Sequence, residues 1–260
     1  MTLFALLAAA PAFAQVSLYS SDELARLAAP IALYPDPLLA QVLAAATFPD
    51  QLPDAARWAD AHRDLKGATL AQAMSAQHLG WDPTVQALLP FPMVLDVMAS
   101  DADWVAKVGK AFLAQQQDVL DAVQRDRAKA IDFGYLRKNE HITVGSPPNV
   151  EIESINFADI VVPSYDPGVV FSAPSAGSPV TQAIHFDTHV EVGGFRLAEW
   201  NSEKFQVIGG YFQPWGWGFS GIDWSKRTVI INLAPWQRNW SNQGDYVHPY
   251  PELTRVPPHG

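Results

Sequence analysis

The sequence predicts an α+β protein in which an N-terminal helical, bundle-like domain is followed by a smaller, antiparallel β-rich and Trp-rich C-terminal domain. Apolar residues recur at helical spacing from about residue 20 to residue 133. After Gly134 the pattern changes to short β-branched runs separated by turn residues. Six of the nine tryptophans lie between Trp200 and Trp240. A chain of 260 residues is long enough to bury a sizeable core.

The N-terminus resembles a secretory signal rather than part of the fold. An apolar run from Leu3 to Ala12 leads into Ala12-Phe13-Ala14, a small-x-small pattern that suits cleavage near Ala14. The run is shorter than the roughly 20 residues that a membrane span needs. We therefore expect a periplasmic or secreted protein without stable membrane insertion; the alternative is an ordinary buried N-terminal helix.

Helix boundaries can be assigned from caps and prolines. Ser20 and Glu23 form a capping box, and Asp36 and Asp82 each precede a proline, which predicts two aspartate N-caps. We expect helices from 20 toward Pro35, from 36 toward Pro49, over 53–62 and 68–77, a short one after 82 that Pro90 and Pro92 break, and a single long helix over 102–131. The long helix has an apolar face, with Arg125 and Arg127 on its solvent side.

Short strands are predicted in the second half of the chain. The β-branched runs lie at 141–144, 150–153 and 160–162, followed by a turn at 166–168, and further strands are expected at 184–192, 195–197, 205–208 and 228–233. We expect the following division: a signal peptide at 1–14, a helical domain at 20–134, a short-strand segment at 139–171, a linker at 172–180, a β-rich aromatic region at 181–238 and a Pro-rich polar tail at 239–260.

Several of these segments carry a family resemblance. Residues 29–47, APIALYPDPLLAQVLAAAT, together with WDPTV at 81–85 and VVPSYDPGVV at 161–170, are similar to motifs of the bacterial domain of unknown function 3300. The resemblance covers about residues 22–171 and implies an exported envelope protein of Gram-negative bacteria, with no assigned activity. Relatives often continue into a Gly/Ala-rich apolar stretch, whereas residues 172–213 are mixed and charged here.

Composition excludes several classes of function. The chain carries 27 acidic and 17 basic residues, a net charge of −10, so non-specific binding to nucleic acid is not expected. The absence of cysteine excludes disulfides, thiolate metal sites and thiol catalysis. We expect no cofactor.

Two patterns with catalytic potential have simpler explanations. Residues 216–221 match a dinucleotide-binding fingerprint in letters, but no strand precedes them and no helix follows. Glu151 and Glu153 share one face of a predicted strand, as residues of a solvated face also do. We therefore assign no catalytic residues.

The strongest candidate for a metal site lies in the predicted strand 184–192. Strict alternation places His185, Asp187, His189 and Glu191 on one face, and such side chains suit zinc. However, residues two apart on a strand are separated by about 7 Å, too far for three in succession to bind one ion. We favour a solvated face and expect no metal.

Aromatic residues near the C-terminus form the candidate binding surface. Tyr211, Trp215, Trp217 and Phe219 lie among glycines that disfavour a central strand, so we expect a partly exposed contact patch. Trp224, close to the strand at 228–233, is expected in the core. The alternative is that all of these rings form the core of the β-rich region.

These observations favour a non-catalytic envelope protein that binds or scaffolds through its β-rich aromatic part. An envelope protein or a glycan would be the partner, since flat rings can stack on either. Two alternatives stay open: a periplasmic hydrolase or metal-dependent enzyme, and a membrane-associated assembly factor.

Overall fold

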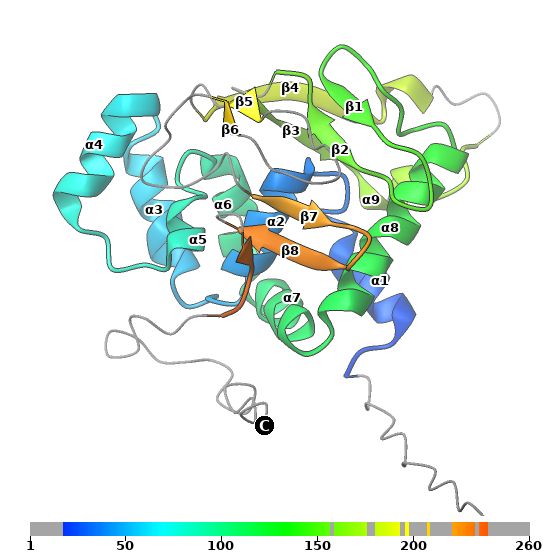
Figure 1. Ribbon diagram of the computed structural model, residues 1–260, viewed down its shortest axis with the longest axis horizontal. Helices are drawn as coiled ribbons and strands as arrows, with labels where there is room; N and C mark the ends of the chain where they lie inside the picture. Colours follow the sequence, from blue (N-terminus) through cyan, green and yellow to red (C-terminus); the bar gives the residue numbers. More distant parts are fainter. Residues whose placement is uncertain are drawn as a thin grey trace, which may run out of the picture.

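The computed structural model describes residues 18–156, 159–175, 180–192, 196–197, 207–208, 220–231 and 234–238, and it confirms the α+β class. Helices fill the N-terminal half and antiparallel strands follow them (Figure 1). The predicted signal peptide, the polar tail and the four aromatic contact residues lie outside the described residues. No helix in the described part of the chain combines the length and the apolar composition needed to cross a lipid bilayer.

Helix α2 lies at the centre of the helical half. The helices are α1 (Ser21–Ala28), α2 (Asp36–Ala45), α3 (Leu52–Ala61), α4 (Gly67–Gln77), α5 (Pro83–Gln86), α6 (Pro92–Ser100), α7 (Ala102–Ala114), α8 (Gln116–Asp132) and, after the first strands, α9 (Pro167–Val170). All residues of α2 except Pro37 are buried, because α5, α7 and the C-terminal strands pack around it. This explains why eight of its ten residues are apolar; the two polar ones, Asp36 and Gln41, are buried as well.

Three helix predictions are wrong. The first helix, expected to run toward Pro35, ends at Ala28. The long helix expected over 102–131 is divided at Gln115, whose backbone leaves the helical region at φ −142°. The Gln115 side chain accepts a hydrogen bond from the Tyr19 N–H and donates one to the Tyr19 carbonyl, so contacts with a distant segment accompany the break. Helix α6 was not predicted; Pro92 begins it, at a position where proline is tolerated.

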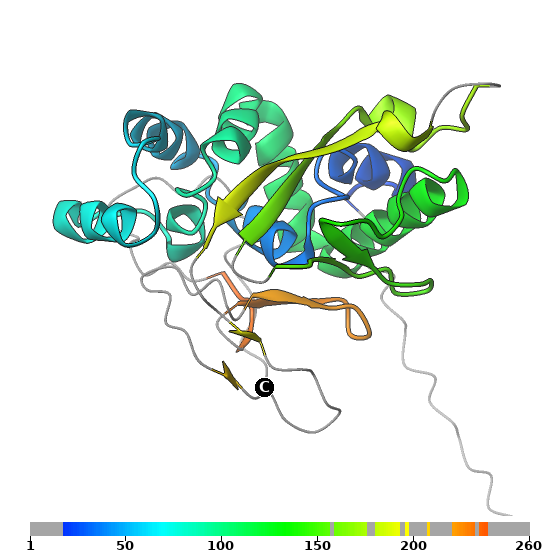
Figure 2. The same cartoon turned by 90° about the horizontal axis from the view of Figure 1, so that it is seen from above.

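The strands form small antiparallel sheets. β1 (Ile142–Val144) pairs with β2 (Ile152–Ser154), β3 (Asp159–Tyr165) with β4 (Ile184–Glu191), and β5 (Arg196–Leu197) with β6 (Val207–Ile208), while β7 (Gly221–Asp223), β8 (Thr228–Ile231) and β9 (Ala234–Pro235) form a three-stranded sheet. Figure 2 shows the orange β7–β8 hairpin along one side of the helices, where β7 and β8 contact α2.

Burial alternates strictly along β4, as expected, but a β-bulge changes its pairing with β3. His185 lies opposite Ser164 and Thr188 lies opposite Val162, so β4 has one more residue than β3 between these partners. The interruption falls at Pro163, which has no N–H to donate to the ladder. His185 therefore shares a face with Thr188, and His189 lies on the opposite face.

Helices and strands share buried clusters. Trp224, Val229, Ile160 and Val162 belong to the same cluster as the residues of α2. Trp224 is 2% exposed, which confirms its predicted place in the core. A second cluster joins α8 to β1, β2 and the other face of β3–β4.

Candidate functional site

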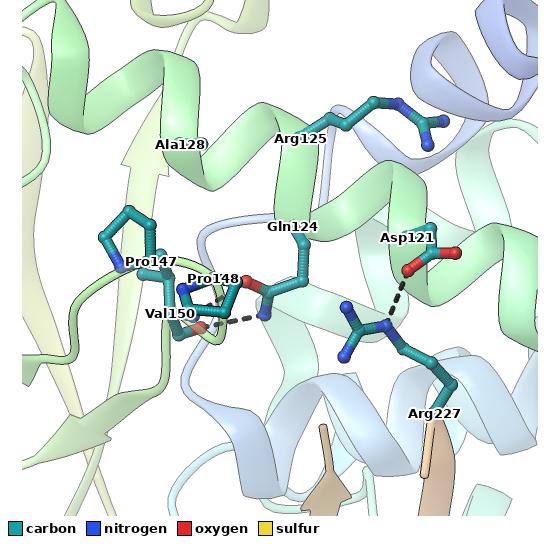
Figure 3. Close-up of a pocket in the computed structure, with 8 residues that line it drawn as sticks. All are labelled: Asp121, Gln124, Arg125, Ala128, Pro147, Pro148, Val150 and Arg227. Atoms are coloured by element: carbon teal, nitrogen blue, oxygen red, sulfur yellow. Dashed lines mark hydrogen bonds and ion pairs between the residues drawn. The ribbon is translucent and has the colours of Figure 1, made fainter. Parts of the chain in front are cut away.

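One hollow of about 280 Å³ lies between α8, the loop before Val150 and the β7–β8 turn (Figure 3). Gln124 from α8 accepts a hydrogen bond from the Val150 N–H at 2.7 Å and donates one to the Val150 carbonyl at 3.0 Å. Arg227 from the turn donates to Asp121 at 2.6 Å and to Asn149 at 3.0 Å. These polar side chains bind groups of the neighbouring elements, so the hollow is a joint at which α8, the loop and the turn meet.

A buried ion pair lies next to this joint. Asp36 at the start of α2 accepts a hydrogen bond from Arg127 of α8 at 2.6 Å and another from the Trp224 indole at 2.6 Å. Arg127 also donates to the Val150 carbonyl at 2.7 Å and lies over the Trp224 ring, 4.9 Å from its centroid. We call Asp36, Arg127, Trp224 and Val150 the clamp, because they connect α2, α8, the β1–β2 hairpin and the β7–β8 hairpin.

The clamp contradicts two predictions made from local pattern. Asp36 does not cap its helix, whereas Asp82 does, accepting the Thr84 N–H at 2.9 Å. Arg127 is 0% exposed instead of facing solvent, and it also donates to the carbonyls of Ala32 and Tyr34. A buried guanidinium needs such partners, because an unpaired charge in the interior is costly.

The clamp has a structural role, because its charged groups are buried and bind one another. Burial raises the pKa of Asp36, while the Arg127 guanidinium and the Trp224 hydrogen bond act in the opposite direction. Both carboxylate oxygens are used by these two donors, and both charged side chains are buried. No solvent-facing acid or base is left at this position.

A second hollow has a different character. This groove of about 340 Å³ lies between α3, the start of α4, the start of α6 and the ends of β3 and β4. Its floor is apolar and includes the buried residues Leu70, Leu89 and Phe91. Met93 lines it and is 37% exposed; Val97, one helical turn further along α6, is 45% exposed. Met93 and Val97 thus extend the apolar surface of the groove along α6.

Charged side chains of opposite sign occupy the two rims of the groove. His62, Arg63 and Lys66 lie on the helical rim, and Asp159 and Glu191 on the strand rim. Arg63 forms ion pairs with Asp60 and Asp96. Among the described residues, Lys66, Asp159 and Glu191 form no ion pair.

The side chains weighed as candidate metal ligands are not brought together. The bulge separates His185 from His189, and Asp187 lies at the bulge between them. Within the described ranges, no three histidine, aspartate or glutamate side chains form a group that could hold an ion. His189 instead lines the groove, with its ring 5.1 Å from that of His141. Glu151 and Glu153 are exposed and line neither hollow.

The groove was missed by sequence reasoning because it is assembled from segments about 100 residues apart. Residues 59–70 and 89–93 form its helical side, and residues 159 and 188–191 its strand side. The signal that could have indicated it is the apolar spacing of Met93 and Val97, which a predicted helix after Pro92 would have placed on one face.

Comparisons with known proteins place the chain among relatives without an assigned activity. A family model described as "Protein of unknown function (DUF3300)" matches residues 20–250. The chain is 33% identical over 199 residues to the Uncharacterized protein YacH of Escherichia coli (strain K12), an alignment that covers 63% of this chain and 32% of YacH. The chain thus matches about a third of the length of that relative. No solved structure matches.

Proposed function

This chain belongs to the DUF3300 family, proteins of unknown function, and we propose that it is a non-catalytic binding protein of the bacterial cell envelope whose binding surface is the groove between α3, α4, α6 and β4. The observation that carries the proposal is the combination of an apolar floor with three rim charges, Lys66, Asp159 and Glu191, that form no ion pair within the described part of the chain. Such a combination is typical of binding sites, in which apolar contacts provide affinity and a few polar groups provide orientation. The sequence analysis expected the binding surface at the aromatic residues 211–219, whereas the surface proposed here is the groove.

The groove is poorly equipped for catalysis. Thr188 supplies its side-chain hydroxyl, but the neighbouring His189 lies on the opposite face of β4 and cannot act as its base. The His62 ring is held by the Trp58 carbonyl at 2.7 Å and is stacked on the Trp58 ring. A nucleophile with a positioned base, the usual sign of a hydrolase, is therefore missing among the described lining residues.

Envelope location is the second part of the proposal. It is supported by the apolar run at residues 3–12 and the Ala12-Phe13-Ala14 site. Mass spectrometry of the protein purified from its native host tests this part. We expect a mature chain that begins at Gln15 in the periplasmic fraction; an intact Met1 in the cytoplasmic fraction would contradict it.

Binding at the groove can be tested in cells with a photo-crosslinking amino acid. Benzoylphenylalanine at Met93 should form a discrete adduct, because a partner in the groove would cover this position. The same group at Val169, which is 45% exposed on α9, provides the control. Adducts of equal yield at both positions, or none at either, would overturn the proposal.

A further inference from the structure

We propose that His141 and His189 together bind one divalent transition-metal ion. The two histidines come from different sheets, because His141 directly precedes β1 and His189 belongs to β4. Their ring centroids lie 5.1 Å apart. Within the described part of the chain no third side chain of a suitable kind joins them, and water fills the other positions around the ion. The inference does not depend on the proposed function, since it concerns a different face of the β3–β4 sheet.

The His189 side chain points away from the floor of the groove. His189 pairs with Val161, which belongs to the buried cluster that includes β1 and β2, whereas the next residue, Val190, packs against the cluster that contains the groove floor. Successive side chains of a strand lie on opposite faces of its sheet. His189 therefore shares a face with Phe186, which also packs against the cluster of β1. This is the face on which the His141 ring lies.

The spacing of the two imidazoles fits a single ion. A zinc–nitrogen bond is about 2.0–2.1 Å long, which places the ion about 3.2 Å from the centroid of each ring that binds it. At the tetrahedral angle the two centroids are then about 5.2 Å apart. The observed separation of 5.1 Å agrees with this arrangement. His189 is exposed, so its ring can turn a nitrogen toward His141.

Contacts with the surrounding chain hold His141 in position. Its backbone N–H donates to the Asn139 side chain at 2.8 Å, and its carbonyl accepts a hydrogen bond from the Ile155 N–H at 2.9 Å. Its ring is stacked on Phe186, with 5.8 Å between the centroids and 22° between the planes. One of the two ligands is thus ordered before the ion arrives, which lowers the entropy that binding costs.

Carboxylates lie around the two histidines. A Glu140 oxygen is 3.6 Å from the His141 Nε2 atom. Glu191 is two residues from His189 on the same face of β4, and Asp159 is the cross-strand partner of Glu191. Negative charges of this kind raise the local concentration of cations. Carboxylates near a metal site also accept hydrogen bonds from imidazole ligands or from bound water, which strengthens metal binding.

The imidazole ligands determine the class of ion. Nitrogen ligands of this type suit zinc, nickel and copper, whereas magnesium and calcium prefer oxygen. Among divalent ions of the first transition row, affinity for such a site is highest for copper. We therefore expect Cu²⁺ to bind more tightly than Zn²⁺, and Mg²⁺ not to compete with either.

Copper titration of the full chain without an affinity tag tests the site. Isothermal titration calorimetry of the metal-free protein, with glycine as a weak competitor, should show one site that binds Cu²⁺ more tightly than Zn²⁺. His141→Gln and His189→Gln should each weaken copper binding at least about tenfold. Electron paramagnetic resonance identifies the ligands: we expect hyperfine splitting from two nitrogens in the natural chain and from one in each variant.

His185→Gln provides the matched control. His185 is exposed on the same strand, but the bulge places it on the opposite face from His189. The change should leave the copper affinity the same within about twofold. Zinc should also raise the melting temperature of the natural chain and of this control, because an ion that binds only the folded protein stabilises it. It should not do so in the His141 and His189 variants, whose folding circular dichroism would verify.

Three results would overturn the proposal. A copper affinity that stays within about threefold in both the His141 and the His189 variant would show that the ion binds elsewhere. An equal loss in His185→Gln would show dispersed binding to surface histidines. Absence of any copper site tighter than about 1 mM in the natural chain would show that the two imidazoles do not hold an ion. None of these results affects the groove, which crosslinking at Met93 tests separately.

Discussion

The two hollows of this protein differ in whether their polar groups already have partners. In the hollow beside α8, Gln124 and Arg227 use their polar atoms on Val150, Asp121 and Asn149. In the groove beside β4, Lys66, Asp159 and Glu191 have no ion-pair partner among the described residues. The first hollow therefore joins elements together, and the second is the surface that we propose for binding.

Substitutions should therefore act differently in the two regions. A change in the joint or in the adjoining clamp should lower the free energy of unfolding. A change at the rims of the groove should alter binding and leave stability nearly the same. The following predictions run from the largest expected effect on the free energy of unfolding to the smallest.

Asp36→Asn in the clamp should have the largest effect. The asparagine keeps the size of the side chain but leaves the buried Arg127 guanidinium without its counter-charge, which costs about 3–5 kcal/mol. Urea unfolding followed by Trp fluorescence measures the loss. A loss below about 1 kcal/mol would show that the clamp does not hold the elements together; Asp22→Asn on the exposed face of α1 is the control.

Gln124→Leu should be the next most destabilising change. Leucine has a similar size but leaves the Val150 N–H without its side-chain acceptor, and an unsatisfied buried donor costs about 1–3 kcal/mol. Gln117→Leu, an exposed position of the same helix, should change the free energy of unfolding by less than about 0.5 kcal/mol. Equal effects in the two variants would contradict the role of the joint.

Asp82→Ala should cost less than the changes in the joint, because the hydrogen bonds of the Asp82 carboxylate lie within its own helix. Its carboxylate accepts hydrogen bonds from the Thr84 N–H and from the Thr84 hydroxyl at 2.7 Å. Loss of such a cap costs about 1 kcal/mol, within a range of about 0.5–2 kcal/mol. Asp166→Ala removes an exposed cap of α9 and should cost less, because water can replace it. The same urea experiment ranks the two.

Glu191→Gln at the groove should have the smallest effect and the opposite sign. Removal of one of two facing carboxylates relieves repulsion, so the free energy of unfolding should rise by about 0.2–1 kcal/mol at low salt. The gain should shrink at about 1 M salt, where exposed charges are screened. A destabilised variant would show that Glu191 already has a partner in the folded chain.

Features with a local cause could be predicted from the sequence. The capping box of Ser20 and Glu23, the cap at Asp82 and the strand at 184–191 all depend on residues within a few positions of each other. Short-range hydrogen bonds and alternating burial leave a readable pattern at that scale.

Features that depend on a distant residue could not be predicted. Asp36 has the same Asp-Pro signature as Asp82, yet its carboxylate binds Arg127 and Trp224, which are 91 and 188 positions away. The break at Gln115 involves Tyr19, and the bulge in β4 lies opposite Pro163 of β3. No periodicity in one segment contains this information, and the groove was missed for the same reason.

Cysteine labelling tests the difference between the two hollows most directly, because the natural chain contains no cysteine. Met93→Cys lies at the groove and Arg125→Cys at the rim of the joint, and both parent residues reach the surface. The rate of maleimide labelling would be compared between the purified protein and intact cells permeable to the reagent. Our account predicts that labelling in cells slows at residue 93 relative to residue 125, because a partner covers the groove alone. Equal slowing at both positions, or slowing at residue 125 only, would contradict it.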